Sequence, residues 1–166
     1  MPTLAADRPR NLTVTRVYTA PVELVWKVWS DPDLVKRWWG PDYFTAPECR
    51  MDFREGGVTV VAMQGPEGPA SYSTWTYRKI VPLQEIEYVQ AMSDAQGQPI
   101  DPTSIGLPAD FPLQTRTVVT FRTRGDHWTE MTVTEYDFKA EGQMYEFAIV
   151  GLHQVVDKIG AVLKNP

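Results

Sequence analysis

Apolar residues recur with helical spacing through the last long stretch of the chain, from Glu141 to Lys164. At about 100° per residue, most of them fall on one broad arc and the polar residues fall opposite. The pattern predicts a helix of about six turns. The residues of the arc are Met144, Tyr145, Ala148, Gly151, Leu152, Val155, Val156, Ile159, Val162 and Leu163. Because this arc is wider than a contact with one other helix needs, we expect it to lie against a large apolar surface.

A period of two dominates most of the preceding chain and predicts strands. Cys49, Met51 and Phe53 alternate with charged residues, and Gly56-Gly57 then predicts a hairpin. The predicted strands of this antiparallel meander and its flanks are 11–19, a segment from 44 to 54, 58–64, 72–81, 85–92, 114–123 and 127–138. The pattern therefore favours an α+β fold, with a curved antiparallel sheet of about six to seven strands around the long C-terminal helix.

Two short helices are predicted after the first strand. Pro21 suits the first position of a helix that runs from Val22 to Trp29, and Asp31-Pro32 repeats a start signal. The second helix ends at Gly40-Pro41. Residues 93–113 contain four prolines and two glycines, and we expect this segment to cover one end of the sheet as a lid.

Composition narrows the functional classes. We expect a flexible tail over residues 1–10 and a single domain over 11–166. No apolar run approaches the roughly 20 residues that span a bilayer, so no membrane insertion is expected. The single cysteine, Cys49, and the lack of a signal peptide favour a cytoplasmic protein. A net charge of −5 with dispersed basic residues argues against a nucleic-acid partner.

The sequence TRVYTAPVELVWKVWSDPDLVKRWWGPDYFT, followed by CRMDFREGG, resembles the opening of proteins similar to the C-terminal domain of the activator of heat-shock protein 90 ATPase. KIVPLQEIEY and the late VDKI continue the resemblance, which covers nearly the whole chain from Asn11. This family of the START-like (SRPBCC) superfamily implies a helix-grip fold with a cavity between sheet and helix. FAIVGL stands where the family often carries a GW-x-x-GW-like run, which implies a more aliphatic helix wall.

No catalytic or metal-binding group emerges from the sequence, and no cofactor is expected. His153 falls opposite the apolar arc and His127 lies beside a predicted turn, so both are interpreted as solvent-facing. Glu130, Glu135 and Asp137 are assigned to a solvated face of the last strand. Two histidines and one cysteine placed in this way do not form a zinc site or a Cys/His nucleophile.

Aromatic and thioether residues are more informative, because flexible Met beside aromatic walls suits an adaptable apolar pocket. Core packing is the plainer interpretation for each of them taken singly. The candidate ligand-binding residues are Trp39, Met51, Thr59, Val61, Met63, Trp75, Tyr77, Phe121, Met131, Phe147 and Leu152. Thr59, Trp75 and Tyr77 supply the polar groups of this set.

The preferred hypothesis is binding of a small apolar or aromatic ligand in the cavity. An enzyme of the cyclase or aromatase kind is the first alternative, and a titratable group inside the cavity would distinguish it. A co-chaperone-like interaction module is the second, although the family's separate chaperone-binding domain has no room in 166 residues, so a chaperone partner is disfavoured. Homodimer formation is left open.

Overall fold

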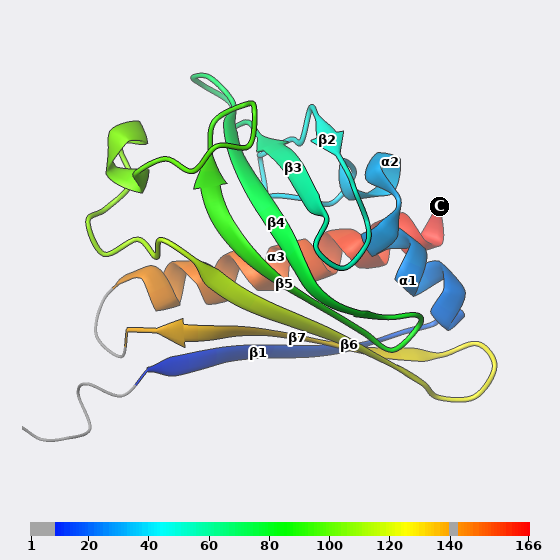
Figure 1. Ribbon diagram of the computed structural model, residues 1–166. Coiled ribbons are helices and arrows are strands. Elements are labelled where there is room, and N and C mark those ends of the chain that lie inside the picture. The colour runs from blue at the N-terminus through cyan, green and yellow to red at the C-terminus, as the bar shows by residue number, and fades with distance from the viewer. Residues whose placement is uncertain (1–8, 140–142) are drawn as a thin grey trace, which may run out of the picture.

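The computed structural model describes residues 9–139 and 143–166. One antiparallel sheet has the strand order β1-β7-β6-β5-β4-β3-β2 and curves over a long helix (Figure 1). The strands are β1 (Arg10–Tyr18), β2 (Cys49–Arg50), β3 (Val58–Met63), β4 (Ser71–Val81), β5 (Glu85–Ser93), β6 (Thr115–Thr123) and β7 (Thr129–Phe138). The predicted α+β helix-grip fold is confirmed.

Two short helices follow β1 where the start signals predicted them. The second ends at Val35 instead of continuing to Gly40-Pro41, because the N–H groups of Arg37 and Trp38 bond to the carbonyls three residues earlier and form a turn. Helix α1 (Val22–Ser30) begins after Pro21, whose missing N–H costs no hydrogen bond at that position. Helix α2 (Pro32–Val35) is capped by Asp31, whose carboxylate accepts a hydrogen bond of 2.9 Å from the backbone N–H of Asp33. Helix α1 carries Trp29 and the turn after α2 carries Trp38 into the core, where both are buried.

Helix α3 (Gln143–Lys164) crosses the concave side of the sheet (Figure 1). Its C-terminal half is the packed half, because Leu152, Val155, Val156, Ile159 and Val162 are all buried. Polar contacts also hold this half in place, among them the pairing of Arg16 with Asp157 at 2.6 Å. The Tyr18 hydroxyl donates to the Val156 carbonyl at 2.8 Å, and the Lys158 ammonium donates to the Gly40 carbonyl at 2.8 Å.

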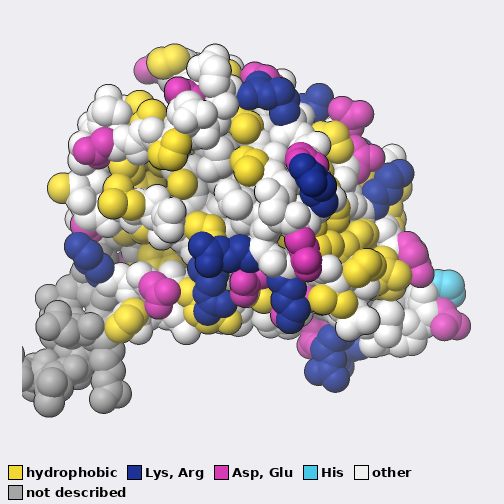
Figure 2. Space-filling view, viewed as in Figure 1, with side chains coloured by type: hydrophobic (Ala, Val, Ile, Leu, Met, Phe, Trp, Pro, Cys, Tyr) yellow, Lys and Arg dark blue, Asp and Glu magenta, His cyan; other side chains and the backbone are white. Residues whose placement is uncertain are grey.

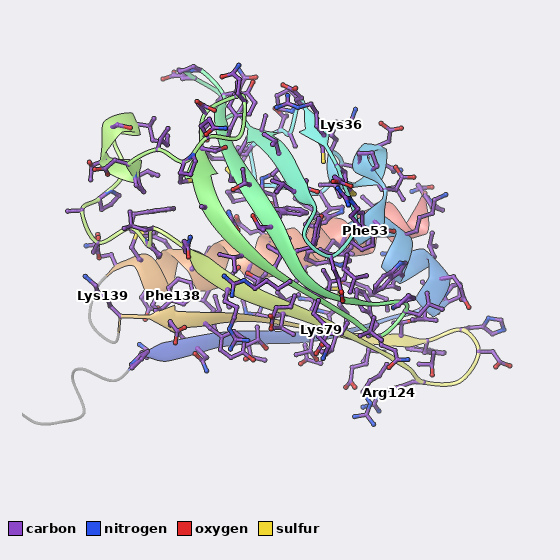
Figure 3. The ribbon with its side chains drawn as sticks, in the orientation of Figure 1. Lys36, Phe53, Lys79, Arg124, Phe138 and Lys139 are labelled. Carbon is purple, nitrogen blue, oxygen red and sulfur yellow. The ribbon has the colours of Figure 1, made fainter. Side chains whose placement is uncertain are left out.

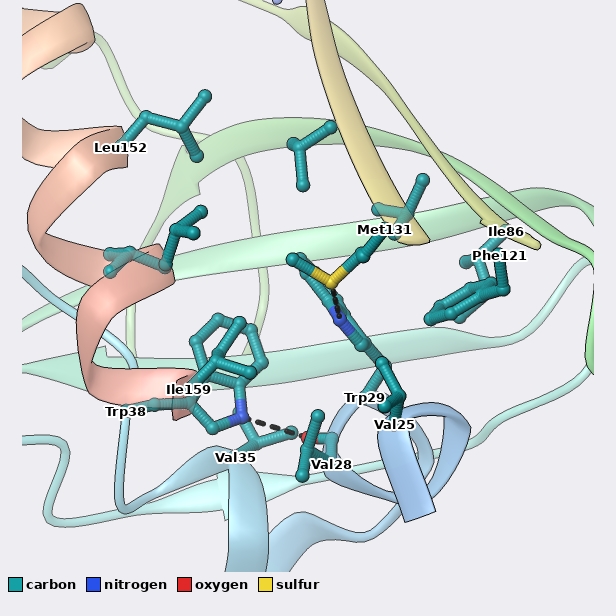
Figure 4. Packing of buried hydrophobic residues seen from close by; sticks show 14 of the residues in the cluster. Val25, Val28, Trp29, Val35, Trp38, Ile86, Phe121, Met131, Leu152 and Ile159 are labelled. Atoms are coloured by element: carbon teal, nitrogen blue, oxygen red, sulfur yellow. Dashed lines mark hydrogen bonds between the residues drawn. The ribbon is translucent and has the colours of Figure 1, made fainter. Parts of the chain in front are cut away.

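The core lies between the concave face and the helices (Figure 4). Alternation along the strands directs Val119 and Phe121 of β6 and Met131 and Val133 of β7 inward, and all four are buried. The Trp29 indole N–H donates to the Met131 sulfur at 3.3 Å, and the Trp38 indole N–H donates to the Val28 carbonyl at 2.8 Å. The two indoles are thereby fixed beneath the sheet.

The outer face of the sheet carries paired charges (Figure 2). Arg116 meets Glu87 across β6 and β5 at 3.0 Å, and Lys79 meets Glu85 at 2.6 Å. Exposed pairs of this kind contribute about 0 to 1 kcal/mol each. They mark this face as the solvated one, in agreement with the alternation.

The strand predicted before Gly56-Gly57 is much shorter than its alternation suggested. Strand β2 pairs only Cys49 and Arg50 with β3, and the chain then turns, with the Arg54 N–H donating to the Asp52 carbonyl at 3.0 Å. The Asp52 carboxylate also accepts from the Arg54 side chain at 2.9 Å. This local hydrogen bonding competes with the ladder, so the chain leaves the sheet at Met51.

Residues 94–114 form the long connection between β5 and β6, as predicted from their composition. A turn begins at Asp94, and the 3₁₀ helix η1 (Pro102–Ile105) is capped by the Asp101 carboxylate, which accepts from the Thr103 N–H at 2.9 Å. Figure 1 shows this connection at the end of the sheet that overhangs the start of α3. Among the described helices, none is long and apolar enough to cross a membrane.

Candidate functional site

A cavity of about 960 Å³ lies between the concave face of the sheet and the N-terminal half of α3. The helix contributes Met144, Phe147, Ala148, Gly151 and Leu152 to its wall, and β3, β4, β5 and β7 form the opposite side. The long connection adds Ile105, Leu107 and Phe111 at one end. Its partly exposed apolar residues, Phe44, Ile105 and Phe147, mark where the cavity opens to solvent.

Small side chains on both walls explain why this volume is not filled. On α3, Ala148 and Gly151 face the cavity, and a Cβ atom added at Gly151 would meet no atom within 4 Å. On the sheet, Ser71 and Ser73 of β4 face it. One turn further along α3, Val155, Val156 and Ile159 are large and buried, so the space closes there.

Aromatic rings form the inner end of the cavity. Trp29, Trp38, Trp39 and Tyr88 line it, while Trp75 lies behind them and is 1% exposed. Trp75 stacks on Tyr88 with ring centroids 5.0 Å apart and meets Trp39 edge to face at 4.9 Å. These contacts make the aromatic end rigid, because each ring is held by two or more others.

One indole in this wall has an unused donor. The Trp39 N–H is buried and has no hydrogen-bond partner within the described part of the chain, and Trp39 lines the cavity. A buried N–H left unpaired costs about 1 to 3 kcal/mol, so it is available to an acceptor on a bound molecule.

A carboxyl group also faces the cavity. Glu135 lines it, on the same side of β7 as the buried Met131 and Val133. Glu135 is opposite Thr117 on β6, and Thr117 is opposite Tyr88 on β5, so the three side chains form a row across the sheet. Neighbouring side chains in such a row lie about 5 Å apart.

Burial raises the pKa of the Glu135 carboxyl to about 7, because the cavity and the sheet remove it from water. Among residues 9–139 and 143–166, no side chain forms an ion pair or hydrogen bond with it. Burial and the nearby Glu135 charge raise the pKa of Tyr88 well above its usual value. A side-chain interaction with the buried Thr117 hydroxyl opposes this rise in the pKa of Tyr88.

Four of the candidate residues from the sequence, Trp39, Met63, Phe147 and Leu152, line this cavity. Seven others lie outside its wall and pack in or against the core: Met51, Thr59, Val61, Trp75, Tyr77, Phe121 and Met131.

Specific contacts explain where most of these residues lie. The Thr59 and Tyr77 hydroxyls hydrogen-bond to each other at 2.8 Å, and Tyr77 also packs on Phe53. Figure 3 shows Phe53 and Phe138 near opposite ends of the sheet, and Phe138 is the one that lines the cavity. Phe121 packs on Trp26 with centroids 5.3 Å apart, and Met131 accepts the Trp29 N–H.

The interpretation of Glu135 as part of a solvated strand face was wrong. Glu130 does face outward, where it pairs with Arg124 at 2.9 Å. Glu135 has the opposite parity and shares a face with Met131 and Val133, so the same alternation that turned Glu130 outward turns Glu135 inward. The sequence already contained this signal, because Glu135 lies an even number of residues from Met131 and Val133, which the alternation had assigned to the inside.

Both histidines are exposed, as the pattern predicted. Within the described ranges, no group of three His, Cys, Asp or Glu residues is placed to hold a metal ion. Cys49 is half-buried, and burial raises the pKa of its thiol to about 11, so the thiol stays protonated near neutral pH.

A family model described as "Activator of Hsp90 ATPase homolog 1-like protein" matches residues 19–164. The chain belongs to this family. No curated protein matches the chain. The architecture of this chain, with a sheet around α3, is the helix-grip fold, a ligand-binding fold of the START-like superfamily.

Solved structures of proteins from several bacteria share the fold of this chain. A protein from Arthrobacter aurescens is 25% identical, with a TM-score of 0.77, and the match covers 94% of this chain and 87% of that one. A Mycobacterium smegmatis protein is 24% identical, with a TM-score of 0.71 and coverages of 94% and 91%. An AHSA1 protein from Silicibacter pomeroyi is 16% identical, with a TM-score of 0.72 and coverages of 93% and 98%.

Proposed function

We propose that this protein binds a small, mainly apolar or aromatic molecule in the cavity between the sheet and α3. The observation that carries the proposal is the cavity itself, about 960 Å³ in volume and walled by aromatic and aliphatic side chains. Pockets for small molecules measure about 300 to 1,000 Å³ and combine apolar walls with a few polar groups. Here the unpaired Trp39 N–H and the Glu135 carboxyl are such groups.

Binding of the neutral apolar dye N-phenyl-1-naphthylamine tests this proposal. Its fluorescence should rise on titration with the protein and saturate at one site. Ala148→Trp should abolish this binding, because Ala148 lines the cavity and an indole there would occupy it. Val150→Trp is the matched control, because Val150 is 56% exposed on the same helix and is not in the cavity wall. No saturable binding, or equal loss in both variants, would contradict the proposal.

A catalytic role is the second candidate, and Glu135 is the observation that favours it. A carboxyl group with a pKa of about 7 can both donate and accept a proton near neutral pH, as a general acid–base catalyst must. Mass spectrometry of a small-molecule extract incubated with the protein tests this role. A compound consumed by the parent but not by Glu135→Gln would support catalysis, and no difference between the two proteins would argue against it.

A further inference from the structure

The charges that line the cavity all have one sign. Within the described residues, its charged side chains are Glu135 on β7 and Glu67 on the exposed loop between β3 and β4, and no Lys, Arg or His faces it. An anionic ligand would find no counter-charge in such a site. A cationic ligand would find a carboxylate on the inner wall and another on the loop, so the charges select for a positive group.

The aromatic wall favours the same charge. Trp29, Trp38, Trp39 and Tyr88 line the cavity, and Tyr88 is separated from Glu135 only by Thr117 in the row across the sheet. Ring faces attract cations by about 0.5 to 2 kcal/mol each, with Trp the strongest. A cation held at Glu135 would share the inward row of the sheet with the Tyr88 ring, with Thr117 between them.

We propose that the molecule bound in this cavity is an apolar or aromatic amine, whose protonated nitrogen pairs with the Glu135 carboxylate while its apolar body lies against the aromatic wall. This inference rests on the proposed ligand-binding function and narrows it to one chemical class. It explains why the fold keeps a half-buried carboxyl group without an ion-pair partner among its described residues: the ligand supplies the partner.

The protonation of Glu135 gives the pairing a characteristic pH dependence. Without ligand the carboxyl has a pKa of about 7, so at pH 6 it must first lose a proton before it can pair with an ammonium group. Three other titratable groups line the cavity: Tyr88 from β5, Tyr72 from β4 and Glu67 from the loop. Among the described residues, neither α3 nor the connection that carries η1 adds a titratable group to the cavity wall. Amine affinity should therefore rise about tenfold from pH 6 to pH 8, whereas the affinity for a neutral ligand should stay constant.

Three naphthalene probes that differ in one substituent test the inference: 1-naphthylmethylamine, 1-naphthylmethanol and 1-naphthoic acid. Each is titrated against the dye-loaded protein at pH 8, and displacement of N-phenyl-1-naphthylamine reports its affinity. We expect the amine to bind at least tenfold more tightly than the alcohol, and the acid to bind more weakly than either. Equal affinities for amine and alcohol would overturn the amine inference and leave the proposed cavity function standing. Failure of the dye and all probes to bind would overturn both.

Glu135→Gln and a matched variant test whether the Glu135 carboxylate causes the preference for the amine. Glu135→Gln should reduce the affinity for the amine to about that for the alcohol. Glu130→Gln removes the same charge from the outward face of the same strand and should preserve the preference for the amine. A Glu135→Gln protein that still prefers the amine would overturn the inference. An independent check needs no variant. The ratio of amine affinity to alcohol affinity is measured for the parent at pH 6 and at pH 8, and a ratio that does not change with pH would also overturn the amine inference.

Discussion

Glu135 places a carboxyl group where the rest of the inward face of β7 places apolar side chains. Met131 and Val133, four and two residues earlier, are buried in the core, and Glu135 continues their row at the point where the core gives way to the cavity. Its charged form lacks a partner in the described fold, and burial therefore raises its pKa from the ordinary 4.5 to about 7.

The first prediction is that Glu135 makes the protein less stable as the pH rises from about 4.5 to about 7. In this window the folded state holds a proton that the unfolded chain has already released, so the free energy of unfolding falls until the folded carboxyl ionises. Glu135→Gln should be more stable than the parent by about 1 to 3 kcal/mol at pH 8 and by much less at pH 5. Urea denaturation at both pH values measures the difference.

Glu130→Gln is the control for this pH dependence, since it loses only a surface pair with Arg124. Its stability relative to the parent should change by less than about 0.5 kcal/mol between pH 5 and pH 8. A Glu135→Gln protein that tracks the parent over this range would show that the carboxyl is solvated.

Helix α3 has two halves with different roles. From Leu152 onward five of its apolar side chains, Leu152, Val155, Val156, Ile159 and Val162, are buried against the rest of the fold, and the Tyr18 hydroxyl donates to the Val156 carbonyl. Before Leu152, its inward residues Met144, Ala148 and Gly151 border the cavity instead. The C-terminal half therefore anchors the element, and the N-terminal half holds one wall of the site at a fixed distance from the sheet.

The second prediction concerns the boundary between these halves. Leu152 is 7% exposed, and Leu152→Asp would bury a carboxylate without a partner and lower the free energy of unfolding by several kcal/mol. His153→Asp is the matched change at the next residue, which is exposed, and it should cost less than about 0.5 kcal/mol. Thermal melting of the two variants compares them. A Leu152→Asp protein that melts within a degree or two of the parent would place the buried face elsewhere.

At the scale of the whole molecule, the sheet curves further than α3 and the tryptophans can fill. Core residues close the end of the enclosed space near α1 and α2, where Trp29 and Trp38 pack with centroids 4.6 Å apart. The other end keeps about 960 Å³ of open volume beneath the connection that carries η1. The same strands thus hold a solid core at one end and an open cavity at the other.

The third prediction uses two positions on one face of β3 to separate cavity from core. Met63 lines the cavity, whereas Val61, two residues earlier, is 0% exposed and lies outside the cavity wall. Met63→Trp should change the free energy of unfolding by less than about 1 kcal/mol, while Val61→Trp should lower it by about 1 to 3 kcal/mol or more through overpacking. Chemical denaturation measures both.

Dye binding by the Met63→Trp variant provides a second measurement for this comparison of Met63 with Val61. Met63→Trp should weaken saturable uptake of N-phenyl-1-naphthylamine while the fold is retained, since the indole takes up cavity volume. Equal destabilisation by the two variants would mean that the space around Met63 is packed as tightly as the core around Val61.

The sequence by itself determined the elements and the faces of this protein. Helical spacing predicted α3, the cap signals at Pro21 and Asp31-Pro32 predicted α1 and α2, and period-two alternation predicted most strands and their inward residues. These signals are local, because the periods of helix and strand decide on which side each side chain lies. The family resemblance, and with it the helix-grip fold, was also visible in short motifs of the chain.

Only the tertiary structure decided which inward residues face open space. Alternation turns Val61, Met63, Trp75 and Glu135 toward the same concave side, but it does not say what lies opposite each of them. Trp39 from the turn after α2 covers Trp75, whereas the small side chains of Ala148 and Gly151 on α3 leave room in the cavity that Met63 and Glu135 border. Whether a side chain is core or cavity wall depends on residues far away in the chain, because packing fills volume between elements while periodicity describes one element at a time.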